Sequence, residues 1–499
     1  MSDLNKTQQS PDIGNHSTIS TEGMSSRSQF WRAIVFSLLA TFVAVAMAGW
    51  SGQDFAWHQI AIISVLQFLL LVHPMHRVLS LYYINKDLLQ PAIVASSTFI
   101  VFHMLLNPIA IANLDVFIMR GMLVSVTPEF MASVIMSYAV VAVAWFSYYV
   151  GSCLILRNTV EQSDMVVSSS VLSLAFLVIG GAYVGVGIIG NISVLGDFDI
   201  YVDKMLHFYE RWETWEIANI HGGFKWIIMM KFLPAGLILL ALGSWLYNGG
   251  GRARLFILLF IAAVANVFLS SATGGRGSTL MVAFYSIPLL NAYVKRFSVK
   301  MFIQFSGVLV LVSYMLGVMR AASYYNVMEG RSLINLFVSL DQVIAFIVRY
   351  LTNFVGTITL VNEVRQTGII WGKTAFAGLT GLFGGLTPVT TELEVWWRLK
   401  GQYVTVNPRY GPPGELYLNF GWIGLIIGMI LVGLVVAVLS RMYAKALSRK
   451  GISAGMIIVF TSFTAYFLVI ANLSYIPAYF TFFSVPFYFV FLFFRNRLC

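Results

Sequence analysis

The feature that most constrains this chain is a series of apolar runs, most of them about 18 residues long or longer, that recurs from one end to the other. A helix of that length crosses the hydrocarbon core of a bilayer, which is roughly 30 Å thick. Only 10% of the residues are charged, whereas a soluble domain carries about 25%. The sequence therefore predicts an all-α fold, a polytopic bundle of transmembrane helices.

The boundaries of the apolar runs predict about twelve spans. They are 32–50, 57–74, 91–113, 131–155, 168–190, 226–247, 255–272, 279–294, 301–319, 417–440, 452–471 and 477–494. The chain then divides into four segments, each with its own expected role. These are a disordered cytoplasmic tail (1–31), a bundle of spans 1 to 9 (32–319), a long periplasmic loop (320–416), and spans 10 to 12 with a short cytoplasmic C-terminus (417–499).

The formal net charge of +10 would also fit a protein that binds nucleic acid. Placing the N-terminus in the cytoplasm assigns nearly all of this basic excess to the segments on the cytoplasmic side. The positive-inside rule requires that distribution, so topology explains the charge and nucleic acid is not an expected partner. We predict a multi-pass protein of a bacterial inner membrane with both termini in the cytoplasm.

One segment of the periplasmic loop has two interpretations. Residues 334–361 are apolar enough to enter the bilayer but contain charged and amide side chains. A single extra span there would move the basic segment 441–450 to the outside, against the charge rule. The segment either lies at the interface as an amphipathic helix, or it enters the bilayer together with a second segment near 370–386. The interfacial arrangement is preferred, so we expect the outer loop to carry interfacial helices.

Two segments on the predicted outside are long and rich in functional side chains. Residues 191–225 combine six acidic residues with aromatic ones, and residues 320–416 are rich in Gly, Trp, Tyr and Arg. Long ordered loops usually carry function, so chemistry is expected at the outer membrane–water boundary. The two cysteines, Cys153 and Cys499, and the histidines lack the spacing of a metal site, so no metal or other cofactor is expected.

A short turn of small residues, 271–278, joins two apolar runs. Arg276 would lie at the outer membrane face there, flanked by Gly275 and Gly277, which let a ligand approach the backbone closely. An arginine and the N–H groups of a glycine-rich turn both suit a phosphate. The alternative is a tight turn with one solvated arginine. Arg320, which follows span 9 at the same face, is either a second phosphate ligand or a snorkelling anchor.

The segment 407–424 contains the densest group of candidate residues. Its Pro and Gly residues break regular structure just before a span and direct Arg409 and Tyr410 toward the start of the helix. Glu415 is expected in the first helical turn, either as a carboxylate favoured by the helix dipole or as a proton acceptor at the membrane face. Asn419, four residues on, shares that side of the helix and could orient a sugar hydroxyl.

The passage Pro-Gly-Glu-Leu-Tyr-Leu-Asn-Phe-Gly-Trp-Ile-Gly (413–424) opens a late span after a long outer loop and an arginine-containing turn of small residues (273–278). In these respects the chain resembles bacterial oligosaccharide repeat-unit polymerases of the O-antigen polymerase type. The resemblance in topology covers nearly the whole chain, whereas close residue agreement is confined to about 409–424. O-antigen ligases share this architecture, but the histidine-containing motif of their outer loop has no clear match in 320–416.

The resemblance implies a membrane-embedded fold of the glycosyltransferase C type and an enzyme that joins repeat units linked to undecaprenyl diphosphate. It implies membrane lipids, a chain-length regulator and a flippase as partners. For catalysis we expect Glu415 to accept the proton, and Arg276 and Arg409 to stabilise the leaving diphosphate. The expected substrate-binding residues are Arg320, Tyr410, Tyr417, Asn419, Gly275 and Gly277. An O-antigen ligase and a polysaccharide transporter or flippase remain the alternatives.

Overall fold

The structure is a computed structural model whose described residues are almost entirely helical. They are residues 26–50, 57–112, 128–154, 170–206, 229–230, 232–271, 276–329, 343, 346, 353–372, 411–449 and 452–471. No strand occurs among them, so the predicted all-α class is confirmed for this part of the chain. The predicted tail and the predicted last span, 477–494, lie outside the described residues.

The helices fall into an N-terminal and a C-terminal series. The first comprises α1 (Ser26–Trp50), α2 (Trp57–Asn85), α3 (Pro91–Ile100), the π-helix η1 (Val101–Leu105), α4 (Asn107–Ala112), α6 (Pro128–Cys153), α7 (Ser170–Leu195) and α8 (Phe198–Leu206). The second comprises α11 (Phe232–Tyr247), α12 (Arg252–Ser271), α13 (Arg276–Leu289), the π-helix η2 (Leu290–Val294), α14 (Val299–Glu329), α17 (Phe354–Thr367), α20 (Gly411–Arg449) and α21 (Ile452–Ile470).

Seven helical segments among the described residues are long and apolar enough to cross a membrane. They are Arg27–Gly49, Trp57–Asn85, Pro91–Ala112, Met131–Cys153, Ser173–Leu195, Arg252–Ser270 and Gly411–Leu447. Four shorter apolar segments coincide with further predicted spans and are Phe232–Tyr247, Met281–Val294, Val299–Val312 and Ile457–Ile470. The chain is therefore a multi-spanning membrane protein by length and composition, and the figure of about twelve spans stays a prediction.

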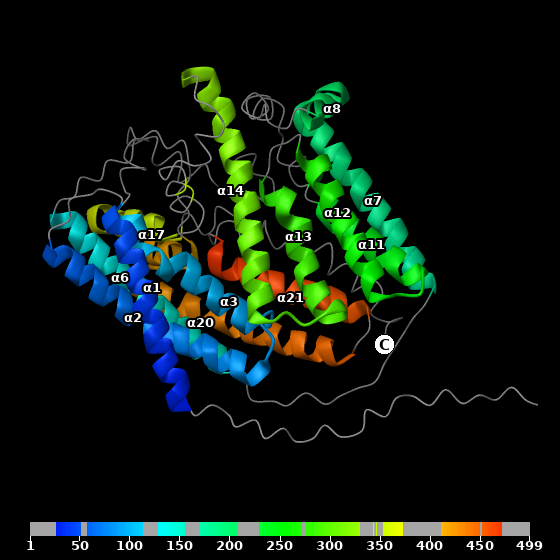
Figure 1. The fold of residues 1–499 in the computed structure, drawn as a ribbon. Coiled ribbons are helices and arrows are strands. Elements are labelled where there is room, and N and C mark those ends of the chain that lie inside the picture. Colours follow the sequence, from blue (N-terminus) through cyan, green and yellow to red (C-terminus); the bar gives the residue numbers. More distant parts are fainter. Residues whose placement is uncertain are drawn as a thin grey trace, which may run out of the picture.

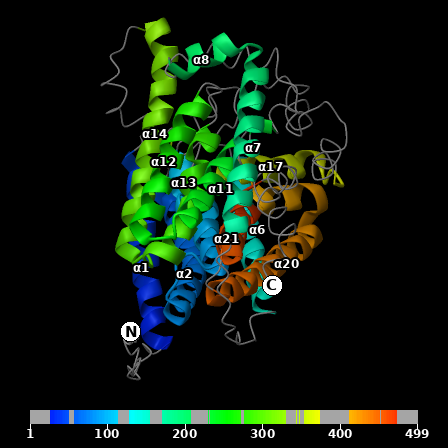
Figure 2. The same cartoon turned by 90° about the vertical axis from the view of Figure 1, so that its right-hand side faces the viewer.

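The helices pack around two hydrophobic cores. One core joins α2, α3, α6, α17 and α20, and the other joins α7, α11, α12, α13 and η2. Helix α21 contributes residues to both. In Figure 1 the helices of the first group run across the view, whereas α7, α11, α12, α13 and α14 run steeply. Figures 1 and 2 both show α8 and one end of α14 projecting together beyond the other helices.

Glycines let α6 and α20 approach backbone to backbone at two points. A Cβ atom on Gly151 of α6 would lie only 2.1 Å from the carbonyl oxygen of Ile430, and one on Gly433 of α20 only 2.2 Å from that of Tyr148. Small residues at such crossings are typical of helix packing in membranes, where close van der Waals contact replaces the hydrophobic effect. These contacts fix α20, whose first residues belong to the candidate site, against α6.

Helix α20 is broken at Gly421, which has a φ of 63° and a ψ of −153°. The break leaves the carbonyl of Leu418 without its helical partner, and the backbone N–H of Ile370 binds it at 3.2 Å. Gly421 thus redirects the chain at this point. The helix begins at Gly411 rather than at the predicted 417, because prolines are tolerated in a first turn.

Candidate functional site

A buried polar cluster lies where η1, α17, α20 and α21 meet. His103 Nε2 lies 2.9 Å from the carbonyl oxygen of Val469, and because a carbonyl only accepts, Nε2 carries the proton. The side-chain nitrogen of Asn353 lies 3.3 Å from the same Nε2 and donates to the carbonyl of Ile470 at 3.2 Å. We call His103, Asn107 and Asn353 the His103 cluster.

Several polar atoms of this cluster are buried with nothing to bind. His103 Nδ1, Asn353 Oδ1 and both polar side-chain atoms of Asn107 have no hydrogen-bond partner in the described part of the chain, and all three residues are completely buried. Each such atom costs about 1–3 kcal/mol. Native proteins keep few of them, often at functional positions, so the cluster is better explained by a ligand or a reaction than by stability.

His103 lies in a segment of distorted helix. The residues of η1, Val101–Leu105, form a π-helix, which is uncommon and frequently marks a functional site. Asn353 precedes α17, and its backbone N–H donates to the carbonyl of Phe102 at 2.7 Å. The distortion thus frees a carbonyl that holds the start of α17 against η1.

The first residue of α20 completes this arrangement. Gly411 has a φ of 60°, and a Cβ atom there would lie 2.6 Å from His103 Cε1 and 2.8 Å from Asn353 Nδ2. Only glycine permits both that conformation and that approach. The positive end of the short helix that precedes the break at Gly421 therefore lies against the His103 cluster.

Glu415 lies one turn further along this short helix and is completely buried. Because α20 starts at Gly411, no acidic residue occupies its first turn, and the prediction that Glu415 lies in that turn is wrong. Asn419 Nδ2 donates to the backbone carbonyl oxygen of Glu415 at 2.8 Å, so the predicted shared side is confirmed. Burying a carboxyl group costs free energy that its contacts must offset, so this is an unusual position for a glutamate.

A hydrogen-bonded arginine lies at the edge of the same region. The exposed Arg365 of α17 donates from Nη1 to Ser133 Oγ at 2.9 Å, and Ser133 Oγ donates to Asn362 Oδ1 at 3.1 Å. Helix α17 packs against α20, where the ring of Tyr417 lies edge-on against Trp422 at 5.1 Å between centroids. A cation is therefore held beside the short helix that carries Glu415.

Three of the nine predicted site residues, Glu415, Tyr417 and Asn419, lie on the short first part of α20. Arg276 and Gly277 begin α13, and Arg320 lies in α14. The structure describes only the backbone at these three positions. Gly275, Arg409 and Tyr410 lie outside the described residues. The gathering of the predicted arginines around Glu415 therefore stays a prediction.

His103, Asn353 and Arg365 are not among the site residues predicted from the sequence. One signal points to His103, because an ionisable side chain inside a span is usually functional. The histidines were considered only as possible metal ligands, so this signal was not used. Asn353 and Arg365 lie in a loop with many polar residues, and only the packing of α17 against α6 and α20 distinguishes them.

The donor set of this region favours acid–base and anion chemistry. It offers a carboxyl group (Glu415), an imidazole nitrogen with a lone pair (His103), the side-chain amides of Asn107, Asn353 and Asn419, and an arginine (Arg365). Among the described residues there is no group of three or more His, Cys, Asp or Glu side chains that could hold a metal ion. No protein-family model, no curated protein and no solved structure matches the chain.

Proposed function

We propose that this protein is a membrane glycosyltransferase that polymerises oligosaccharide repeat units linked to undecaprenyl diphosphate. The reaction would take place at the periplasmic face of a bacterial inner membrane and build an O-antigen, capsule or exopolysaccharide. One observation carries the proposal. Glu415, within the passage 413–424 on which the resemblance rests, is a buried carboxyl group on a short broken helix that starts against the His103 cluster.

The proposed reaction assigns a role to each group. A hydroxyl of the acceptor repeat unit attacks the anomeric carbon of the donor glycan, and a new glycosidic C–O bond forms. The bond from that carbon to the lipid diphosphate breaks, and the diphosphate leaves with the electron pair. Glu415 takes the hydroxyl proton as general base, and the His103 Nδ1 lone pair accepts a hydrogen bond from a substrate hydroxyl.

The leaving diphosphate needs fixed positive charge. Arg365 is the described cation beside the short helix, and Arg276, Arg320 and Arg409 are the further candidates from the sequence. Fixed cations aimed at developing negative charge usually give the largest single contribution to catalysis. A chain-length regulator and a flippase are the expected partners, because polymer length has to be set and each repeat unit has to reach the periplasmic face.

A reconstituted reaction tests this proposal. The purified protein is placed in vesicles with a lipid-linked repeat unit from a bacterium that makes a surface polysaccharide, and products are resolved as a ladder of chain lengths. Wild-type protein should give a ladder, and Glu415→Gln should not. Single transfers onto a lipid A-core acceptor without a ladder would indicate a ligase instead.

A transporter or flippase is the second candidate, because one specific feature favours it. Transporters often bind substrate at discontinuous helices. Helix α20 is discontinuous at Gly421, and the short helix before the break starts at Gly411 against the His103 cluster. In the same vesicles a transporter would move the lipid-linked repeat unit between leaflets without lengthening it. Protection of the glycan from an added glycosidase measures that movement, so the two candidates give different products.

A further inference from the structure

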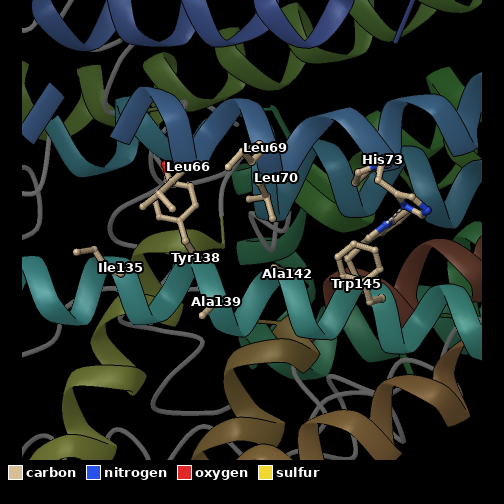
Figure 3. Close-up of a pocket in the computed structure, with 11 residues that line it drawn as sticks. Leu66, Leu69, Leu70, His73, Ile135, Tyr138, Ala139, Ala142 and Trp145 are labelled. Carbon is tan, nitrogen blue, oxygen red and sulfur yellow. Dashed lines mark hydrogen bonds between the residues drawn. The ribbon is translucent and has the colours of Figure 1, made fainter. Parts of the chain in front are cut away.

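A groove between α2 and α6 has features that the proposed reaction does not use. Its volume is about 310 Å³, and Figure 3 shows it lined by α2 on one side and by α6 on the other. It exists because α6 presents Ala139 and Ala142 between the larger Ile135 and Phe146. Phe146 is 52% exposed and Leu69 64% exposed, so this α2–α6 groove opens on a surface that faces lipid in a membrane.

One end of the α2–α6 groove carries a hydrogen-bond donor. Trp145 Nε1 donates to His73 Nδ1 at 2.9 Å, so in the neutral ring His73 Nε2 carries the proton. No acceptor for this proton occurs among the described residues. Figure 3 shows His73 at the end of the groove beside Trp145, while the remainder of the lining is apolar apart from Tyr138.

A cation follows one helical turn after His73. Arg77 lies with its guanidinium carbon 5.1 Å from the ring centre of Tyr149, and its Nη2 atom is 3.7 Å from Cys153 Sγ. It forms no ion pair with a carboxylate in the part of the chain that the structure describes. Its position four residues after His73 puts both side chains on the α2 face toward α6.

The depth of Arg77 fits the headgroup region of one leaflet. From Trp57, where α2 begins, to Arg77 the helix rises about 30 Å, the thickness of the hydrocarbon core. Cys153 is the last residue of α6, so Arg77 lies where two helices leave the membrane. The charge pattern predicts that end to be cytoplasmic, and the α2–α6 groove runs from it into the hydrocarbon core.

We propose that the α2–α6 groove binds one acyl chain of an anionic phospholipid from the cytoplasmic leaflet. The lipid phosphate pairs with Arg77, and His73 Nε2 donates to a phosphate or ester oxygen. An anionic headgroup is favoured over a zwitterionic one because no carboxylate among the described residues neutralises Arg77. In the predicted topology the headgroup end of the groove, at Arg77, lies on the cytoplasmic side of the bundle, whereas the proposed sugar transfer takes place on the periplasmic side.

Native mass spectrometry of the detergent-purified full chain tests the site. The probes are phosphatidylglycerol and phosphatidylcholine with identical acyl chains. Wild-type protein should retain phosphatidylglycerol about tenfold better than phosphatidylcholine, the ratio expected from one charge-assisted hydrogen bond. Arg77→Gln should bring the two lipids to near equality, and Ala139→Phe, which fills the groove, should lower retention of both.

Two matched variants control for unspecific effects. Arg252→Gln removes an exposed cation at the start of α12, and Ala46→Phe adds the same ring to an exposed alanine of α1, so both should behave as wild type. Equal retention of the two lipids by wild-type protein, or an unchanged lipid adduct in Ala139→Phe, would overturn the proposal. Displacement of phosphatidylglycerol by undecaprenyl phosphate would also overturn it, because the groove would then belong to a prenyl lipid. Arg77→Gln leaves the groove open, so it tests the site even where Ala139→Phe fails to fold.

Discussion

The backbone N–H of Ile370 binds the carbonyl oxygen of Leu418 at 3.2 Å. This bond joins the residues that follow α17 to the short helix at the start of α20. It is possible because Gly421 has a conformation that interrupts the helix. The packing of α17 on α20 therefore depends on the break in α20. Together they hold the short helix that carries Glu415 in place.

Gly421→Ala should destabilise this arrangement. A side chain at a φ of 63° costs about 1–2 kcal/mol, and the added Cβ would lie 2.7 Å from Ile369 Cδ1. We expect a lower midpoint of thermal unfolding in detergent. The control is Gly307→Ala in α14, where a Cβ meets no atom within 4 Å, and this variant should unfold no earlier than wild type.

Glu415→Gln should abolish polymer formation and leave the protein folded. The change keeps the shape of the side chain and removes its ability to accept a proton, so the rate should fall by at least about 100-fold. Ladder formation in vesicles measures the rate, and thermal unfolding reports the fold. Asp199→Asn, at an exposed position of α8, is the matched control, and a normal ladder from Glu415→Gln would exclude the residue from catalysis.

His103→Phe should separate function from stability. Phenylalanine has a similar size and removes the buried Nδ1 atom that lacks a partner. It also removes the hydrogen bond from Nε2 to the Val469 carbonyl. These two effects oppose each other, so we expect the free energy of unfolding to change by no more than about 1 kcal/mol while activity is lost.

Gln67→Leu is the comparator for His103→Phe. Gln67 is fully buried, donates to the Met104 carbonyl at 2.6 Å and accepts from the Tyr138 hydroxyl at 3.1 Å. Its loss should cost about 2 kcal/mol because both partners lose their bonds. If His103→Phe were instead the more destabilising of the two, the histidine would be a structural residue.

Arg365→Gln should weaken substrate binding. The guanidinium is exposed and held by Ser133, so its removal should raise the KM for the lipid-linked substrate about tenfold through loss of a charged hydrogen bond to the diphosphate. Initial rates at varied substrate concentration give this value. Arg441→Gln removes an exposed cation further along α20 and should have no effect. An unchanged KM in Arg365→Gln would remove this residue from the site.

Asp87→Asn should destabilise the opposite end of the bundle. The Asp87 carboxylate accepts hydrogen bonds from Tyr443 Oη at 2.8 Å, from Asn291 Nδ2 at 3.0 Å and from the Leu89 N–H at 3.0 Å. An amide would present N–H groups to some of these donors, at a cost of about 2 kcal/mol. Thermal unfolding measures the loss, and Tyr443→Phe should cost about half as much. Wild-type stability of Asp87→Asn would mean that these bonds contribute nothing.

The sequence predicted the helical class and the location of most apolar helices because charge depletion and run length act locally. It also predicted that Glu415 and Asn419 share a helix side, which follows from helical spacing. It could not predict the break at Gly421, because a glycine in an apolar run serves packing equally well. It could not join His103 to Asn353 either, since these residues are far apart in sequence and meet only through the packing of α17, η1 and α21.

The glycine contacts of α6 have a consequence for the effect of the membrane on this protein. One side of α6 touches α20 through Gly151 without an intervening side chain, and another side forms a wall of the α2–α6 groove. Because α6 is a rigid helix, a small displacement at the wall of the α2–α6 groove should also displace its contact with α20. The lipid composition of the surrounding bilayer should therefore tune the geometry around Glu415.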